Sequence, residues 1–175
     1  DGHDKLKMVV GVTGNSQDPE ADARRVASVR DAIGPDVQLM FDANYLMSYH
    51  HALRLCKLVE PLNITWFEEP VYGNDVMLLA DLRRATTIPV AAGQNEGHRF
   101  RHRELLMHRA VDILQPDALI LGGITEFMKV AALAQANDLD IAPHGNQYIH
   151  IHLVAAIPNG LTLEYYRDSV DPMHG

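Results

Sequence analysis

The sequence of 175 residues is poor in cysteine, in long apolar runs and in positive charge. Its single cysteine, Cys56, excludes an intramolecular disulfide and any metal site built from several cysteines, which favours a reducing, cytoplasmic setting. No apolar run approaches the roughly 18 residues that span a bilayer, so we expect no membrane segment. Lys and Arg total 15 against 23 Asp and Glu, and this acidic balance argues against nucleic-acid binding.

A glycine-rich nucleotide motif is also missing from the first turn. Residues 11–15 read Gly-Val-Thr-Gly-Asn, which matches neither G-x-G-x-x-G nor G-x-x-x-x-G-K. An open, doubly wound sheet often binds nucleotides through such a turn, so this architecture lacks its usual sequence support here.

Short apolar runs rich in β-branched residues alternate with amphipathic stretches along the whole chain. This alternation predicts an α/β fold with parallel strands covered by helices. We expect seven strands, at Leu6–Val10, Val37–Phe41, Ile64–Phe67, Pro89–Ala92, Val111–Leu114, Leu139–Ala142 and Leu161–Leu163. We expect helices at Pro19–Ile33, Ser48–Val59, Asp75–Ala85, Arg99–His108, Ile124–Ala136 and Gln147–Ile157. No linker or charge block interrupts the series, so residues 1–175 are expected to form a single domain.

A polar residue lies in or just after each expected strand. These residues are Lys7, Asp42, Glu68, Gln94, Asp117, His144 and Glu164, and from Asp42 onward they are 20 to 27 residues apart. One polar residue per βα unit, always at the same end, is typical of a parallel (βα) barrel of the TIM type with its site at the C-terminal face. Seven strands instead of eight would make this barrel incomplete.

Two of these residues are carboxylates on neighbouring strand ends. Asp42 and Glu68 would form a hard oxygen site suited to Mg²⁺, which prefers carboxylate and water ligands. The amide oxygen of Gln94, one unit further on, can complete such a site but adds no charge. Each residue alone could equally be a helix cap or a surface polar group.

Asp117 and His144 suggest a second group with acid–base chemistry. A carboxylate on one strand can orient and charge-stabilise an imidazole on the next, which is the usual support of a histidine general base. The alternative is that His144 is a structural histidine. Two further histidines, His150 and His152, fall in an expected helix and are interpreted as packing or surface residues.

Several short motifs together resemble the enolase superfamily, within it the mandelate racemase subgroup that contains acid-sugar dehydratases. They are FDAN at 41–44, WFEEP at 66–70, AAG at 91–93, QPD at 115–117 with GGIT at 122–125, and APH at 142–144. The resemblance implies an enolase-like C-terminal barrel with Mg²⁺ held at Asp42, Glu68 and position 94. It implies that Asp117 and His144 form the general-base dyad, that Glu164 hydrogen-bonds the intermediate, and that Lys7 is the first lysine of a K-x-K strand.

The implied reaction is removal of the proton α to a carboxylate of a sugar acid, followed by loss of water through an enediolate. Asn44 and Asn95 are expected substrate contacts. The alternatives are a racemase or epimerase of a 2-hydroxy acid, and a non-catalytic barrel fragment. The expected partners are a small-molecule carboxylate and either further copies of the chain or the missing part of a longer one.

The sequence departs from the family pattern in three respects. Position 94 is Gln where Glu is usual, which would weaken Mg²⁺ binding unless Glu96 replaces it. The second lysine position of K-x-K is Val9, when the strand is aligned on Gly11, and this disfavours racemisation because a base is missing from one face. An N-terminal capping domain and a first barrel strand are absent from the sequence.

Overall fold

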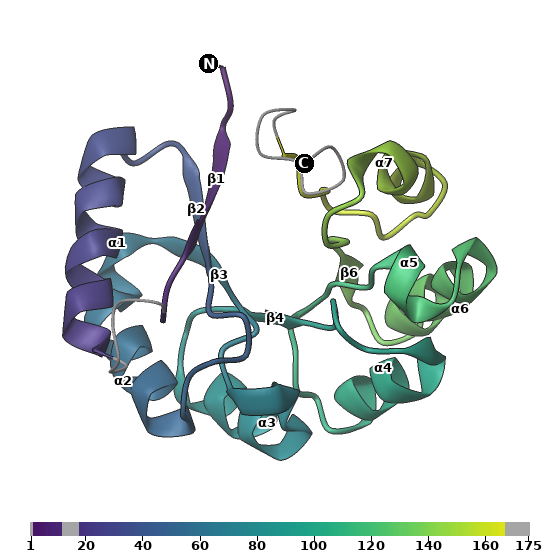
Figure 1. The fold of residues 1–175 in the computed structure, drawn as a ribbon, viewed down its shortest axis with the longest axis horizontal. Coiled ribbons are helices and arrows are strands. Elements are labelled where there is room, and N and C mark those ends of the chain that lie inside the picture. Colours follow the sequence, from purple (N-terminus) through teal and green to yellow (C-terminus); the bar gives the residue numbers. More distant parts are fainter. Residues whose placement is uncertain (1, 12–17, 167–175) are drawn as a thin grey trace. The chain divides into compact units, whose positions relative to one another are not determined.

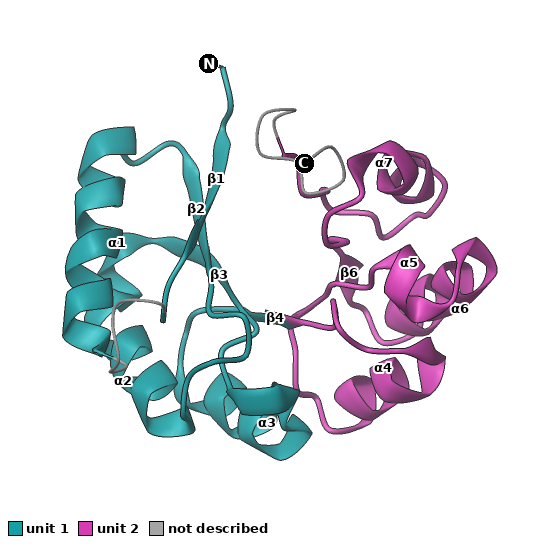
Figure 2. Cartoon of the chain, viewed as in Figure 1, with its two compact units in different colours: residues 1–91 teal, residues 92–175 magenta. Residues whose placement is uncertain are grey.

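The computed structural model describes residues 2–11 and 18–166. The chain forms two compact units, Asp1–Ala91 and Ala92–Gly175, which Figure 2 shows in different colours. Most of the first turn considered above, residues 12–15, lies outside the described residues. Each unit is built from parallel strands that alternate with helices, which confirms the α/β class.

The first unit contains the longer strands (Figure 1). In chain order its elements are β1 (Lys5–Val9), α1 (Pro19–Ile33), β2 (Gln38–Asp42), α2 (Tyr49–Val59), β3 (Ile64–Glu68), α3 (Val76–Ala85) and the start of β4 (Val90–Ala92), with short 3₁₀ turns at Glu60–Leu62 and Tyr72–Asn74. Strands β1 to β4 pair in parallel in sequence order. This register sets Asp42 opposite Glu68, so the two carboxylates end adjacent strands.

Helices of the first unit begin where the sequence offers a capping side chain. The Asp18 carboxylate accepts a hydrogen bond from the backbone N–H of Ala21 at 2.9 Å, and Pro19 opens α1. In the same way Ser48 caps α2 and Asp75 caps α3. Helices α1 and α2 pack against each other (Figure 1).

The second unit has shorter strands. Its elements are α4 (His98–Met107), β5 (Ile113–Leu114), α5 (Ala118–Leu121), α6 (Ile124–Gln135), β6 (Asp140–Ile141) and α7 (Gln147–Ala155). Strands β5 and β6 pair in parallel, with Ile113 opposite Asp140. Both therefore end at the same edge, and the loops that follow them carry Asp117 and His144.

Two details of the expected element pattern differ from the structure. The segment Leu161–Leu163 is not a strand: Gly160 forms one isolated parallel bridge with Ile141, and Leu161 N–H donates to Ile141 O at 2.8 Å. After this segment, the backbone N–H of Tyr166 donates to a side chain and not to a strand, with Gln147 Oε1 as the acceptor at 2.8 Å. The four-residue helix α5 was not expected from the sequence.

No helix in the part of the chain that the structure describes has the length and apolarity needed to cross a membrane.

Candidate active site

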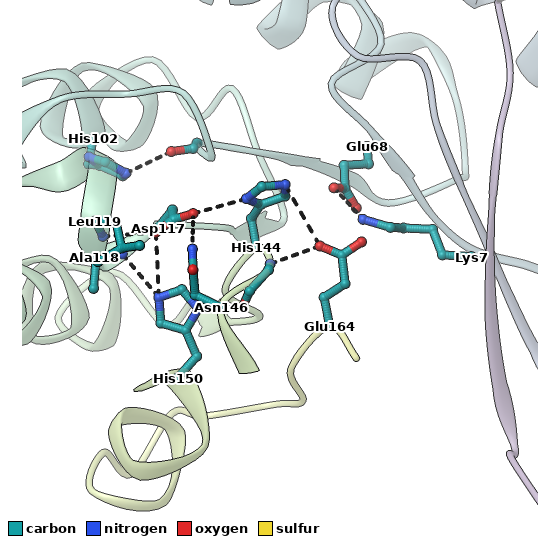
Figure 3. Close-up of polar contacts among 12 residues, drawn as sticks. Lys7, Glu68, His102, Asp117, Ala118, Leu119, His144, Asn146, His150 and Glu164 are labelled. Atoms are coloured by element: carbon teal, nitrogen blue, oxygen red, sulfur yellow. Dashed lines mark hydrogen bonds and ion pairs between the residues drawn. The ribbon is translucent and has the colours of Figure 1, made fainter. Parts of the chain in front are cut away.

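Strands β1, β2 and β3 of the first unit bring Lys7, Asp42 and Glu68 together. Asp42 and Glu68 are almost completely buried, with 6% and 0% of their surface exposed. Lys7 Nζ lies 2.7 Å from Glu68 Oε1, and the lysine side chain is only 18% exposed (Figure 3). A buried carboxylate needs such a partner, because ionised groups are costly to remove from water.

A residue outside the expected set also holds Glu68. The indole Nε1–H of Trp66 donates to Glu68 Oε2 at 3.1 Å, so both carboxylate oxygens of Glu68 have a donor. Trp66 and Glu68 are two residues apart in β3 and therefore point to the same side of the strand. This i, i+2 spacing was the available sequence signal for Trp66.

Asp42 has a strongly raised pKa, about 7 instead of 3.8. Burial is the largest cause, and the neighbouring negative charge of Glu68 adds to it. Lys7 and the backbone N–H of Asn44, which donates to Asp42 Oδ1 at 2.7 Å, lower the pKa but do not compensate. Two buried carboxylates that repel each other suit a divalent cation site, because a bound cation offsets their negative charges.

Gln94 lies in the second unit, two residues after β4. Its side chain is 2% exposed, and among the described residues its Oε1 is buried with no hydrogen-bond partner. A buried carbonyl oxygen normally has a donor or a cation, so this atom fits the role of a ligand. Glu96, the alternative ligand, is instead paired with Arg101, whose Nε lies 3.0 Å from Glu96 Oε2.

The backbone just before Gln94 is tightly surrounded. Gly93 has φ +128°, a conformation that side chains rarely adopt. A Cβ there would lie 3.3 Å from His102 Nε2 and 3.4 Å from the backbone N of Gln115. His102 Nε2 also lies 3.2 Å from the carbonyl oxygen of Gly93. The backbone that leads into Gln94 is therefore constrained by contacts with His102 and with Gln115.

Asp117, in the second unit, is as buried as Asp42 but has a full set of donors. Its Oδ1 accepts from the backbone N–H of Leu119 at 2.8 Å, and its Oδ2 accepts from Asn146 Nδ2 at 2.8 Å. His144 Nδ1 lies 3.1 Å from the same Oδ2 (Figure 3). Burial would raise the pKa of Asp117, but the bonds from His144 and Leu119 outweigh it and lower the pKa.

His144 therefore faces an aspartate that stays ionised. A carboxylate can only accept, so the proton of the neutral His144 ring belongs on Nδ1 and the lone pair on Nε2. Nε2 lies 3.9 Å from Glu164 Oε2, and Glu164 Oε2 accepts from Gly145 N–H at 2.9 Å. The structure thus brings Asp117, His144 and Glu164 together, with 29% of the His144 side chain exposed.

The two expected substrate contacts differ in setting. Asn44 is partly buried, with a left-handed φ of 47°, two residues after the end of β2. Asn95 is exposed in the loop after β4.

His150 and Asn146 also belong to this group, although the sequence did not indicate it. His150 is fully buried, and both of its ring nitrogens have hydrogen-bond partners, so it is a packing residue as expected. His152 is exposed, so it is the surface residue of the pair. Asn146 lies two residues after His144, and this proximity was the only signal for it.

The described residues contain no group of three or more His, Cys, Asp and Glu side chains arranged to hold a metal ion. Asp42 and Glu68 are a pair, and the expected third ligand is an amide.

Comparison with known proteins identifies the family. The family model described as "Enolase C-terminal domain-like" matches residues 1–174. The chain belongs to the enolase superfamily. The sequence is 35% identical over 161 residues to an L-talarate/galactarate dehydratase of Salmonella typhimurium, covering 92% of this chain and 39% of the relative. It is 40% identical over 140 residues to a D-galactarolactone cycloisomerase of Agrobacterium fabrum, covering 80% of this chain and 35% of the relative.

Solved structures of enolase-superfamily proteins agree. The crystal structure of an L-talarate dehydratase from Polaromonas sp. JS666, complexed with Mg and L-glucarate, superposes with a TM-score of 0.88 at 38% identity, covering 94% of this chain and 45% of that one. This confirms the parallel (βα) barrel class in an incomplete form, since the described residues contain six strands and a closed barrel has eight. The chain spans about two fifths of the length of the curated relatives it matches.

Proposed function

We propose that the protein carrying this chain is a Mg²⁺-dependent dehydratase of a sugar acid. The observation that carries the proposal is the bond of 3.1 Å between His144 Nδ1 and Asp117 Oδ2, on an aspartate whose pKa is lowered. The names of related enolase-superfamily proteins support it, since they include dehydratases of talarate, galactarate, galactonate and rhamnonate.

His144 is proposed as the base that takes the proton α to the substrate carboxylate. Ionised Asp117 fixes the Nδ1–H form of the ring, so that Nε2 presents its lone pair, and stabilises the charge that forms when Nε2 is protonated. Glu164 lies on the Nε2 side of the ring and is proposed to hydrogen-bond the intermediate.

Asp42, Glu68 and Gln94 are proposed as the metal ligands. When bound, Mg²⁺ supplies positive charge that stabilises the enediolate as it develops. The fit rests on the raised pKa of Asp42, the burial of Glu68 and the unpartnered Oε1 of Gln94. Lys7 balances the charge of Glu68 and is proposed to help position the substrate carboxylate, with Asn44 and Asn95 as further contacts.

Loss of water then follows from the position of a hydroxyl group on the carbon next to the enediolate. The electrons of the enediolate form the new double bond as the hydroxyl leaves, and a proton on His144 Nε2 is available to make it water. The substrate class follows from this requirement: a carboxylate with a hydroxyl on its β carbon.

Epimerisation is the second candidate, because a racemase from Streptomyces coelicolor A3(2), solved with bound magnesium, is among the similar structures. It needs a base on each face of the substrate, and Val9 stands where the second lysine of the K-x-K pattern is expected. A non-catalytic role is the third candidate, because Gln94 lowers the charge of the proposed metal site.

One experiment separates these candidates. The intact protein is incubated with Mg²⁺ and L-glucarate, galactarate or D-galactonate in D₂O, and proton NMR follows the α proton and the products. Loss of the α proton with formation of a dehydrated keto acid supports the dehydratase. Deuterium uptake without loss of water supports epimerisation. If millimolar Mg²⁺ neither binds nor stabilises the protein, the enzymatic proposal fails.

A further inference from the structure

His150 is a second buried histidine beside the dyad, and the proposed reaction gives it no role. It lies in α7 and has none of its surface exposed. Its ring stacks on Phe127 of α6, with ring centroids 5.8 Å apart and planes inclined by 26°. The ring is therefore held in a single orientation between two helices of the second unit.

Both ring nitrogens of His150 meet backbone groups whose hydrogen-bonding roles are fixed. Ala118 N–H can only donate, and its nitrogen lies 3.0 Å from Nε2, so Nε2 carries the lone pair. Gly145 O can only accept and lies 2.7 Å from Nδ1, so Nδ1 carries the proton. One neutral tautomer satisfies both bonds. A proton on Nε2 would face the Ala118 N–H, and Asp117 Oδ1, at 3.8 Å from Nε2, is too distant to accept a hydrogen bond from it.

These two backbone groups belong to the residues that directly follow the two dyad residues in the sequence. Ala118 follows Asp117 after β5, and Gly145 follows His144 after β6. The imidazole thus joins the two loops through a rigid ring, and its width sets the separation of their peptide groups. Asn146 supplies a second link between the same loops, since its Nδ2 lies 2.8 Å from Asp117 Oδ2.

We propose that His150 is a positioning residue for the His144–Asp117 dyad. In its neutral Nδ1–H form it fixes the distance between the peptide groups after Asp117 and His144, and so keeps their side chains in hydrogen-bond geometry. The effect of His150 on catalysis rests on the proposed function, whereas the two hydrogen bonds of the His150 ring are independent of it.

The tautomer is tested on the intact protein by ¹⁵N NMR of its histidine rings. The proposal requires a protonated Nδ1 and an unprotonated Nε2 at neutral pH. A His150 ring with its proton on Nε2, or one exchanging between forms, would overturn it. This measurement needs neither a substrate nor a variant.

Substitutions of His150 separate the contributions of its two hydrogen bonds. His150→Asn places an amide donor near Gly145 O but removes the acceptor for Ala118 N–H, whereas His150→Gln can keep that acceptor and loses the donor. His150→Phe removes both. The matched controls are His152→Asn and His152→Gln, in the same helix but exposed.

The readout is α-proton exchange of L-glucarate, galactarate or D-galactonate with D₂O. Each polar variant should lower kcat by about 10- to 100-fold, since small misplacements of catalytic groups have effects of this size. KM and Mg²⁺ affinity should stay within about twofold, and the His152 variants should match the parent. Exchange rates in both polar variants within about twofold of the parent would overturn the positioning role.

The failure of the proposed function would look different. If the parent exchanges none of the three acids, that function loses its support, and the NMR signals of the His144 ring decide the inference instead. They should move in the two His150 variants and not in the His152 variants; unchanged His144 signals would overturn it. If His150→Phe does not fold, the tautomer and the two polar variants still give the answer.

Discussion

Asp42 of the first unit ends strand β2 and Asp117 of the second follows strand β5 by three residues, yet the pKa values of these two buried aspartates move in opposite directions. Asp42 shares its surroundings with buried Glu68 and accepts a bond from one backbone N–H, so burial and repulsion dominate. Asp117 accepts bonds from His144 and from Leu119 N–H, which compensate for burial and lower its pKa, and it also accepts a bond from Asn146.

The difference indicates different tasks. A bound cation stabilises the ionised form most for a carboxylate whose pKa is raised. It adds little for a carboxylate whose charge is already stabilised by hydrogen-bond donors. The hydrogen-bond donors around each aspartate therefore distinguish a proposed metal ligand from a proposed partner of a base. The position of each aspartate in the sequence does not distinguish these two roles.

The largest expected effect comes from the base itself. His144→Asn should lower α-proton exchange on the order of 10³-fold, since a general base typically contributes 10²- to 10⁴-fold. Mg²⁺ affinity should remain almost unchanged, because His144 is not a ligand in our proposal. NMR in D₂O and calorimetric titration measure the two quantities, with exposed His108→Asn as the control. A parallel loss of Mg²⁺ binding would show that its role is wrongly assigned.

Asp42→Asn tests the first unit without metal. With the pKa of Asp42 raised from 3.8 to about 7, the folded state binds the proton more tightly than the unfolded state. The associated stability is present below the unfolded pKa and is lost as pH rises through the folded one. In EDTA, the variant should therefore be stabilised relative to the parent more at about pH 8 than at about pH 5, by at most about 4 kcal/mol.

Urea unfolding at the two pH values measures this difference. Asp31→Asn, an exposed change of the same chemistry in α1, is the control. An equal effect of Asp42→Asn at both pH values would show that burial and the charge of Glu68 do not raise the pKa of Asp42 as described.

Gln94→Glu should tighten Mg²⁺ binding if position 94 completes the site. One added charge at contact distance and an effective dielectric near that of a protein surface is worth about 1–3 kcal/mol. This corresponds to roughly 10- to 100-fold in the dissociation constant. Calorimetric titration of both forms, with exposed Gln135→Glu as the control, measures it. Unchanged affinity would mean that Gln94 is not a ligand.

The smallest expected effect concerns a donor to Asp117. Asn146→Gly keeps the left-handed backbone, φ 44°, and removes the amide that bonds Asp117 Oδ2. Unfolding free energy at neutral pH should fall by about 1–2 kcal/mol, as for a hydrogen bond to a charged group. The lowered pKa of Asp117 contributes stability above its unfolded value, so the deficit should shrink as pH falls below about 4.

Asn63→Gly is the matched control for this change. Asn63 is exposed and has a similar left-handed φ of 51°, so it reports the effect of the added backbone freedom alone. Equal losses in the two variants would show that the Asn146 amide does not stabilise Asp117.

Local signals in the sequence were enough for most of the fold. Helix α1 has the expected bounds because Asp18, Pro19 and Gly34 mark both of its ends. Helix α5 was missed because four residues are too few to show a helical period. Leu161–Leu163 has the composition of a strand, but its register with β6 ends after a single bridge.

The candidate site was predictable in part, for a similar reason. Motif spacing alone placed Asp42, Glu68, Asp117 and His144 at strand ends. The bond from Ala118 to His150 joins residues 32 apart in the sequence, so no local pattern reveals it. The roles of the site residues, the single barrel domain over residues 1–175 without a capping domain, the cytoplasmic setting and the oligomer stay predictions.

The crowded Gly93 limits how this chain can be redesigned. A library that varies the loop after β4 to change substrate preference should keep glycine at this position, because a φ of +128° strains any other residue and a Cβ would press on the His102 ring and the backbone of Gln115. Productive variation should begin at Asn95, which is exposed. Deep mutational scanning scored by the abundance of folded protein would then show an abrupt boundary, with strong intolerance at residue 93 and broad tolerance two residues later.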